Sequence, residues 1–358
     1  MFVRKSATPG KRRGLVELRA PGDVATRDIP LATPGASQVV VRTRYSGISA
    51  GTELSTYRGT NPYLDKQWDA HRRLFLRGHA TQSFPVDVWG YSEVGTVIEV
   101  GAEVSTLRPG DVVWGIWGHR SIAVLDATEL SGHLLPPGLD PLVGTFDRVG
   151  AVALNAVLAS DARLGESVAV FGQGVIGLLA TQLLTSMGCQ VVAVDSMPLR
   201  RSLAESWGAL ALDPGADDVA LAVRAILPDG VDRVIELSGA YPALQQAVRV
   251  AGPDGTVIAA GFYQGSAVAL ALGEEFHHNR VSIVSSQIGG LPPALQRRWT
   301  RDRLHQTVMQ LFASGRLNPL PLVTHVIPAQ AAARAYALIE SPPPELLQVV
   351  LDFGQDAP

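Results

Sequence analysis

A glycine-rich turn near the middle of the chain is the strongest chemical signal in the sequence. Gly172, Gly174 and Gly177 directly follow the apolar run 168–171 and open an apolar segment with helical spacing. In a strand–turn–helix unit, the first glycine permits the tight turn, the second lets backbone approach a pyrophosphate, and the third lets the helix pack on the sheet. The helix N-terminus then offers N–H groups to the phosphates. The pattern therefore predicts a dinucleotide-binding site.

An acid at the end of the next apolar run indicates which dinucleotide is bound. Asp195 would accept hydrogen bonds from the adenosine ribose hydroxyls and repel a 2′-phosphate, which favours NAD(H). Arg200 and Arg201 follow closely and could tolerate a phosphate, so NADP(H) stays possible; Arg200 could instead flank the ribose. The residues expected at this part of the cofactor are Gly172, Gly174, Val175, Ile176, Gly177, Asp195, Ser196 and Arg200.

The elements that position this turn divide the chain into three parts. Residues 1–151 contain short apolar runs bounded by turn residues, which predict a small barrel or sandwich. Residues 152–288 alternate buried-type strands with helical patterns, which predict βαβ units and a parallel sheet. Residues 289–358 add two amphipathic helices and a terminal strand. The fold class expected is therefore α/β.

Composition excludes several classes of protein. The chain has 358 residues, 46% of them hydrophobic and 18% charged, which is not a disordered composition. A net charge of −3 argues against a nucleic-acid binder. A single cysteine excludes an internal disulfide and a four-cysteine zinc lobe. Neither a secretory signal nor a membrane span is recognised, so a cytoplasmic protein without a membrane partner is expected.

Several motifs together resemble the medium-chain dehydrogenase/reductase superfamily of zinc alcohol dehydrogenases and quinone oxidoreductases. The resemblance rests on the glycine turn and on the segments 45–49, 90–95, 100–104 and 108–113. It implies a GroES-like β-barrel catalytic domain built from both chain ends, a doubly wound Rossmann domain inserted between them, and a substrate cleft between the two. It also implies later cofactor-side loops at Leu237, Ser238, Gly239, Gly261 and Phe262.

The chain departs from this family where a catalytic zinc would bind. Ser49 stands where the family has a cysteine ligand, Tyr91 stands where it has a histidine, and Asp147 falls at the third ligand position. Zinc prefers thiolate and imidazole, so this is a poor zinc site, and the resemblance implies a zinc-independent member with no metal. A site rebuilt from other side chains stays open as the alternative, with His71, His79 and Glu53 as its candidates.

Without zinc, a side chain must meet the negative charge that grows on a carbonyl oxygen during hydride transfer. Tyr91 is the first candidate because a phenol can donate its proton, and Ser49 could relay it or hydrogen-bond. Asp147 could orient either one or be a neutral donor, and Glu53 could face the substrate. The structural alternatives are that Tyr91 fills the volume of a lost zinc site, that Ser49 satisfies a turn, that Asp147 is a surface or capping acid, and that Glu53 is a helix-start acid.

Within the superfamily, the chain is similar to a branch that includes bacteriochlorophyllide dehydrogenase and sugar- or cyclitol-modifying enzymes of secondary metabolism. The similarity rests on 46–53, 285–287 and 324–325. We expect an NAD(P)H-dependent oxidoreductase that interconverts a secondary alcohol and a ketone on a polar small molecule. A zinc-free reductase of a polarised C=C bond and a non-catalytic NAD(H)-binding protein are the alternatives. By analogy, the edge strand 281–285 would pair two copies into a homodimer.

Overall fold

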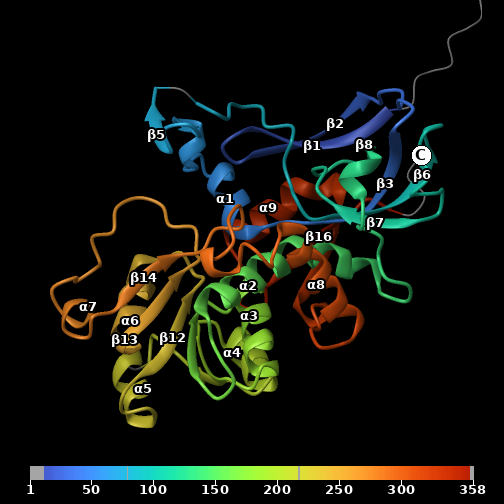
Figure 1. Cartoon of the computed structure of the whole chain (residues 1–358). Helices are drawn as coiled ribbons and strands as arrows, with labels where there is room; N and C mark the ends of the chain where they lie inside the picture. The colour runs from blue at the N-terminus through green and yellow to red at the C-terminus, as the bar shows by residue number, and fades with distance from the viewer. Residues whose placement is uncertain (1–11, 79, 217, 355–358) are drawn as a thin grey trace, which may run out of the picture. The chain divides into compact units, whose positions relative to one another are not determined.

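The computed structural model describes residues 12–78, 80–216 and 218–354 (Figure 1). The chain forms two compact units. The first comprises residues 1–146, 325–341 and 348–358, and the second comprises 147–324 and 342–347. The first unit is therefore assembled from distant parts of the chain, and the second is almost one continuous segment.

The first unit is built mainly of antiparallel strands. One sheet has the order β15-β16-β3-β6-β7, with β8 also paired to β3, and two separate hairpins are formed by β1-β2 and β4-β5. A buried apolar cluster that includes Val39, Val41, Val97 and Trp117 fills its core. The strands and helices are β1 (Arg12–Ala20), β2 (Asp23–Pro30), β3 (Gln38–Gly47), α1 (Ala50–Tyr57), η1 (Pro62–Leu64), β4 (Lys66–Asp69), β5 (Leu74–Arg77), β6 (Glu93–Val100), β7 (Val112–Gly115), β8 (Ile122–Asp126), η2 (Ala127–Leu130), η3 (Pro141–Phe146), β15 (Val323–Pro328), η6 (Ala329–Ala331), α9 (Ala332–Glu340) and β16 (Gln348–Asp352).

The second unit is a six-stranded parallel sheet flanked by helices, with the order β11-β10-β9-β12-β13-β14. Chain order reverses between β9 and β12, and ligands of such sheets bind outside the carboxyl ends of the strands at this reversal. Its strands and helices are α2 (Asp147–Ser160), β9 (Ser167–Phe171), α3 (Val175–Ser186), β10 (Gln190–Val194), α4 (Pro198–Ser206), β11 (Leu210–Leu212), α5 (Val219–Ile226), β12 (Val231–Glu236), α6 (Tyr241–Val250), β13 (Ala251–Ala259), α7 (Glu275–His278), β14 (Ser282–Ser285), η4 (Pro293–Leu295), α8 (Arg301–Ala313) and η5 (Leu320–Leu322).

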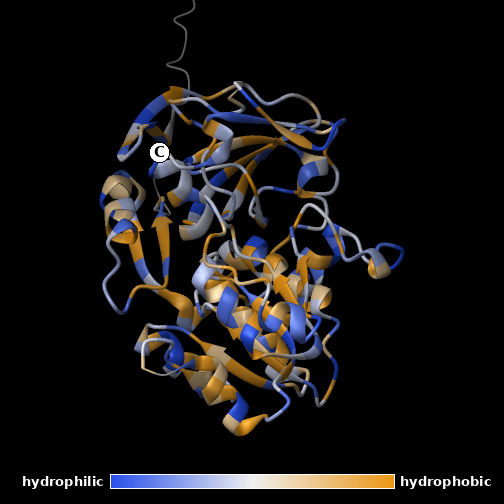
Figure 2. Ribbon diagram, turned by 90° about the vertical axis from the view of Figure 1, so that its left-hand side faces the viewer, coloured by the Kyte–Doolittle hydropathy of each residue, from blue (hydrophilic) through white to orange (hydrophobic). Residues whose placement is uncertain are grey.

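The sequence explains why these strands lie inside the second unit. All five residues of β9 are buried, as are the last four of β10, which is the pattern of strands covered on both faces. Figure 2 draws many of the strands in the orange of apolar residues. Among the described residues, one helical run, Pro141–Ser160, is long and apolar enough to cross a membrane, but 72% of its apolar 18-residue window is buried inside the fold, as in a core helix.

The α/β class and the parallel sheet predicted from the sequence are confirmed. The compact units divide the chain at other residues than the expected 151 and 289. The second unit begins at Asp147 and runs on to Thr324. The reason is helix packing, since α8 lies against α2 within this unit. A Cβ on Gly150 of α2 would be only 2.5 Å from a methyl carbon of Val308 on α8, so the glycine permits the close approach.

Candidate active site and cofactor site

The three glycines of the predicted dinucleotide turn differ in their surroundings. Gly172 has a φ of +84°, and a Cβ there would lie 2.7 Å from the backbone nitrogen of Ser238. A Cβ on Gly177 would lie 1.8 Å from the carbonyl oxygen of Gly172. A Cβ on Gly174, the N-cap of α3, would meet no atom within 4 Å. The first and third glycines are therefore required by packing, whereas the second faces open space at a helix N-terminus.

Asp195 is held against this turn. Its carboxylate accepts hydrogen bonds from the backbone N–H of Gln173, at 2.7 Å, and from that of Met197, at 2.8 Å. A guanidinium nitrogen of Arg200 lies 3.6 Å from the same carboxylate. The acid predicted to receive the ribose hydroxyls is therefore fixed beside the residues predicted to receive the pyrophosphate. Open space at Gly174, the helix N-terminus and this carboxylate together fit a dinucleotide.

The two arginines after Asp195 have different contacts. Arg201 donates to the carbonyl oxygen of Asp195 at 2.8 Å and pairs with Asp213 at 2.9 Å, so it stabilises the turn itself. The Nε of Arg200 is buried and has no hydrogen-bond partner among the described residues. Arg200 is therefore the arginine that retains donor capacity. The remaining predicted residues of this turn lie in the first turn of α3 (Val175 and Ile176) and in an exposed position after β10 (Ser196).

The two later loops, which are predicted to lie on the cofactor side, are close to each other, and one of them also lies beside Gly172. A Cβ on Gly261 would be 2.4 Å from the backbone nitrogen of Gly239, and Leu237 donates its N–H to Phe171 at 2.9 Å. The side chain of Phe262 is exposed. All of these loops are close to the carboxyl ends of β9, β12 and β13, where the order of strands reverses.

A buried carboxyl, which the sequence analysis missed, organises these loops. Glu236 ends β12 and accepts hydrogen bonds from the N–H and hydroxyl of Ser238, the N–H of Gly239 and the hydroxyl of Tyr263. Burial raises the pKa of Glu236, although the hydrogen bonds from Ser238 and Tyr263 oppose the shift. The signal in the sequence was an acid that directly follows two buried apolar residues, Val234 and Ile235, at the end of the strand.

In the first unit, Tyr91 and Ser49 form a pair of hydroxyls, in which Tyr91 donates its proton to Ser49 Oγ. Ser49 is the N-cap of α1, yet its side chain makes no capping hydrogen bond. A serine at this position normally accepts from an N–H of the first helical turn, which stabilises a helix by about 1 kcal/mol. The Ser49 hydroxyl is thus diverted from its local role to Tyr91. We call Tyr91 and Ser49 the hydroxyl pair.

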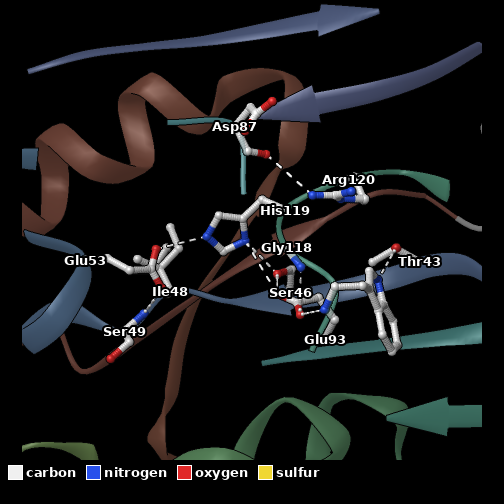
Figure 3. Close-up of polar contacts among 12 residues, drawn as sticks. Thr43, Ser46, Ile48, Ser49, Glu53, Asp87, Glu93, Gly118, His119 and Arg120 are labelled. Atoms are coloured by element: carbon white, nitrogen blue, oxygen red, sulfur yellow. Dashed lines mark hydrogen bonds and ion pairs between the residues drawn. The ribbon is translucent and has the colours of Figure 1, made fainter. Parts of the chain in front are cut away.

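Glu53 connects the hydroxyl pair to a group of buried polar side chains; Figure 3 shows Glu53 between Ser49 and His119. Its Oε1 accepts the backbone N–H of Ser49 at 2.8 Å, and its Oε2 lies 2.9 Å from Nε2 of His119. The hydroxyl of Tyr336 donates to the same Oε2 and lies 2.9 Å from the same Nε2. Glu53 is therefore a first-turn acid of α1 and also a buried carboxyl whose two oxygens both have hydrogen-bond partners.

The group continues on the other side of His119. Its Nδ1 lies 2.6 Å from Ser46 Oγ, and Ser46 donates to Glu93 at 2.8 Å. The second oxygen of Glu93 accepts the backbone N–H of Trp117 at 2.7 Å. The buried network is defined here as Glu53, His119, Tyr336, Ser46 and Glu93. The sequence analysis identified Glu53 alone among them as a candidate.

The ionisable side chains of the buried network change one another's pKa values. Burial alone would lower the pKa of His119, but the carboxylates of Glu53 and Glu93 outweigh it, and the pKa is raised. Burial also raises the pKa of Glu93, against the opposing effects of His119 and of the Trp117 N–H. His119 therefore holds a proton more firmly than a free imidazole does.

The order Ser46–His119–Glu53 has the connectivity of a hydrolytic triad, but its geometry excludes that use. Ser46 is completely buried, and its hydroxyl proton is donated to Glu93 rather than to His119. A nucleophilic serine must be reached by substrate and must deliver its proton to the base. The buried network can position and polarise neighbouring groups but cannot attack a substrate.

Asp147, the third residue predicted beside the hydroxyl pair, begins the second unit. It is buried, so a surface acid is the wrong interpretation, although it does start helix α2. One carboxylate oxygen lies 2.7 Å from Nδ1 of His305, and the other is buried without a partner among the described residues. The partner that the structure assigns to Asp147 is therefore a histidine that the sequence analysis did not consider.

The described residues contain no group of three or more His, Cys, Asp or Glu side chains that could hold a metal ion. Among the candidates for a rebuilt site, His71 is exposed, Glu53 is engaged in the buried network, and His79 lies outside the described residues. At the family's ligand positions in the first unit, the available donors are two hydroxyls bonded to each other. These donors do not fit zinc, which prefers thiolate and imidazole.

Comparison with known proteins assigns the chain to a family. The family model for zinc-binding dehydrogenases matches residues 175–309. D-guloside 3-dehydrogenase of Escherichia coli is 29% identical over 312 residues, which cover 84% of this chain and 88% of that protein. (R,R)-butanediol dehydrogenase of Bacillus subtilis is 28% identical over 291 residues, which cover 73% and 78%.

Solved structures share the fold over nearly the whole length. The 2R,3R-butanediol dehydrogenase of Bacillus subtilis has a TM-score of 0.78 at 22% identity, covering 96% of this chain and 100% of that one. A short chain alcohol dehydrogenase from Escherichia coli CFT073, complexed with NADH, has a TM-score of 0.76 at 20% identity, covering 96% and 100%.

The family model and the dehydrogenase relatives together place the chain with the medium-chain dehydrogenase/reductase superfamily, as the motifs predicted. Its first unit is the GroES-like domain and its second the Rossmann domain. The protein is an NAD(P)-dependent oxidoreductase, and the dehydrogenases that it resembles are named for small-molecule substrates. Assignment to a particular branch of the superfamily, a homodimer and a cytoplasmic location stay predictions.

Proposed function

We propose that this protein interconverts a secondary alcohol and a ketone on a polyol- or sugar-like substrate, with NAD(H) as the favoured cofactor and without zinc. The substrate class is supported by relatives named for guloside, butanediol and sorbitol. The observation that carries the zinc-free proposal is the hydroxyl pair, in which Tyr91 and Ser49 occupy ligand positions and bond to each other.

The nicotinamide, when bound, supplies or removes the hydride. When a ketone is reduced, its oxygen gains negative charge as the carbonyl carbon receives this hydride, and the O–H of Tyr91 is the donor that neutralises it. Before substrate binds, Ser49 Oγ accepts a hydrogen bond from the Tyr91 hydroxyl. Tyr91 therefore keeps a fixed direction until substrate replaces that contact. The phenolate formed by proton donation regains its proton from solvent. In alcohol oxidation the same groups act in reverse.

The proposed reaction is tested with NADH that carries deuterium at the transferred position, offered with keto-sugars and keto-cyclitols to chelator-treated enzyme. We expect deuterium on the carbinol carbon and a rate that the chelator leaves unchanged, since Tyr91 rather than zinc meets the oxygen. Deuterium placed beta to a retained carbonyl would instead establish C=C reduction. Tightly bound zinc whose removal abolishes turnover would overturn the metal-free proposal. Binding of NADH with no turnover of any substrate would favour a non-catalytic role.

The NAD(H) preference predicts a change of specificity in Asp195→Asn. This substitution removes the charge that repels a 2′-phosphate while leaving an acceptor for a backbone N–H, and Arg200 remains to contact the phosphate. We expect the ratio of kcat/KM for NADH to that for NADPH to fall by about tenfold or more, since one charge contact is worth about 1.4 kcal/mol or more. The measurement is initial rates with both cofactors.

The matched control is Asp213→Asn, which removes the acid that pairs with Arg201 and leaves the Asp195 carboxylate in place. This variant should keep the cofactor ratio of the parent. An equal change in both variants would show that the ratio responds to disturbance of the turn, and repulsion by Asp195 would no longer explain the preference.

A further inference from the structure

We propose that His119 is a positioning residue for the hydroxyl pair, and that it acts through the carboxylate of Glu53. The inference rests on the proposed function, because it assigns a role in the reaction only if Tyr91 and Ser49 take part in it. His119 touches neither the substrate nor the reacting atoms in this account. Its effect is to fix the carboxylate that fixes Ser49.

Ser49 is held by its backbone rather than by its side chain. Its hydroxyl makes no cap contact and receives the proton of Tyr91. Its N–H is bound by Glu53 at 2.8 Å. The direction of the hydroxyl that meets Tyr91 therefore depends on where the Glu53 carboxylate lies.

The Glu53 carboxylate is in turn held by side chains from two other parts of the chain. Glu53 itself is on α1, Tyr336 donates to Oε2 from α9, and His119 approaches Oε2 at 2.9 Å from the segment before β8. Tyr336 is fixed in turn, because its ring stacks on that of Trp89 with centroids 4.1 Å apart. Tyr91 follows Trp89 by two residues in the chain. Tyr91 is therefore connected through Trp89, and Ser49 through Glu53, to the same Tyr336 side chain.

The protons of the buried network can be counted. A serine hydroxyl has one proton, and Ser46 gives its proton to Glu93, so the contact between Ser46 and His119 requires an N–H on Nδ1. The hydroxyl proton of Tyr336 goes to Glu53. Two contacts of Nε2 remain, at 2.9 Å to Oε2 of Glu53 and at 2.9 Å to the hydroxyl oxygen of Tyr336, whose own proton already points to Glu53. An N–H on Nε2 serves both acceptors, so a proton held by the imidazole joins His119 to Glu53.

A buried carboxylate that loses such a partner does not stay in place unchanged. Glu53 is 2% exposed, and burying a charge without a counter-charge is costly. Without His119, Oε2 keeps only the hydroxyl of Tyr336 as a donor, and the carboxylate shifts toward other donors or toward solvent. That shift displaces the acceptor of the Ser49 N–H, so the hydroxyl pair loses its geometry while the glycine turn of the other unit is untouched.

The experiment is a double-mutant cycle on kcat with His119→Gln and Ser49→Ala in the full-length protein. His119→Gln keeps a donor near Glu53 but cannot hold a proton as the imidazole does. We expect each single variant to lower kcat by about tenfold, the effect of losing one well-placed hydrogen bond, with KM and the Kd for NADH within about twofold of the parent. The double variant should be no slower than Ser49→Ala alone, because His119 acts through Ser49.

Two further variants separate this role from a general loss of stability. Thr43→Val removes another buried hydrogen bond of the same unit, from Trp117 Nε1 at 2.8 Å, and lies outside the hydroxyl pair and the buried network. It should lower the Tm without lowering kcat. If His119→Gln does not fold, Glu53→Gln replaces it in the double-mutant cycle, since the new amide can accept the Ser49 N–H and donate to His119. It should also be non-additive with Ser49→Ala.

The outcomes are distinguishable. The positioning role would be overturned if the losses in kcat multiply in the double variant, or if kcat is unchanged in both His119→Gln and Glu53→Gln. In either case a slow Ser49→Ala variant would leave the proposed function standing. If Ser49→Ala keeps the rate of the parent, Ser49 has no role in the reaction, and the part of the proposed function on which this inference rests fails.

Discussion

Replacing Tyr91 with phenylalanine is expected to lower kcat by about 10²- to 10⁴-fold, the contribution typical of a positioned general acid. The substitution removes only the hydroxyl that donates to Ser49, and the half-buried ring keeps its packing. Since the dinucleotide turn belongs to the other unit, the Kd for NADH should stay within about twofold of the parent. Steady-state rates and a fluorescence titration of NADH measure the two quantities.

The control for this prediction is Tyr45→Phe, which removes a phenol of strand β3 in the same unit that has no place in the hydroxyl pair or the buried network. It should keep the parent rate. A Tyr91→Phe variant as fast as the parent would mean that the ring only fills the volume where other members of the superfamily bind zinc. Solvent would then have to supply the proton.

The second large effect is expected from valine at Gly174, compared with the same change at Gly177. At Gly174 the new side chain enters open space with a backbone φ of −69° that any residue can adopt. The fold should be kept, with a Tm near that of the parent. The space that is filled is the one predicted for the pyrophosphate, so we expect affinity for NADH to fall by about 100-fold, equivalent to about 2.7 kcal/mol.

At Gly177 the expected result is the opposite. A Cβ would lie 1.8 Å from the backbone oxygen of Gly172, so the helix must separate from the turn. We expect a loss of at least about 2 kcal/mol in the free energy of unfolding, measured by thermal or urea denaturation. Equal effects of the two substitutions on Tm and on binding would show that the glycines do not have separate roles, and the assignment of Gly174 to the phosphate would fail.

The sequence by itself was sufficient for the class of fold and for a specific prediction of the cofactor site. The reason is that these features are local. The three glycines, the apolar run before them and Asp195 after the next strand lie within one strand–turn–helix–strand unit, where spacing alone determines which residues meet. The alternation of buried strands and helices likewise predicts a parallel sheet without knowledge of distant contacts. Glu236, at the end of a neighbouring strand, could have been found by the same reasoning.

Only the tertiary structure identified the buried network in the first unit and the pair of Asp147 with His305 in the second. His119 is 66 positions from Glu53 and 217 from Tyr336, and Asp147 is 158 positions from His305. His119 has no motif of its own, and Tyr336 looks like one more apolar position of a helix. Their meeting depends on an antiparallel sheet that is assembled from strands of both ends of the chain. Contacts of that range are set by packing of whole elements, and no pattern of neighbouring residues encodes them.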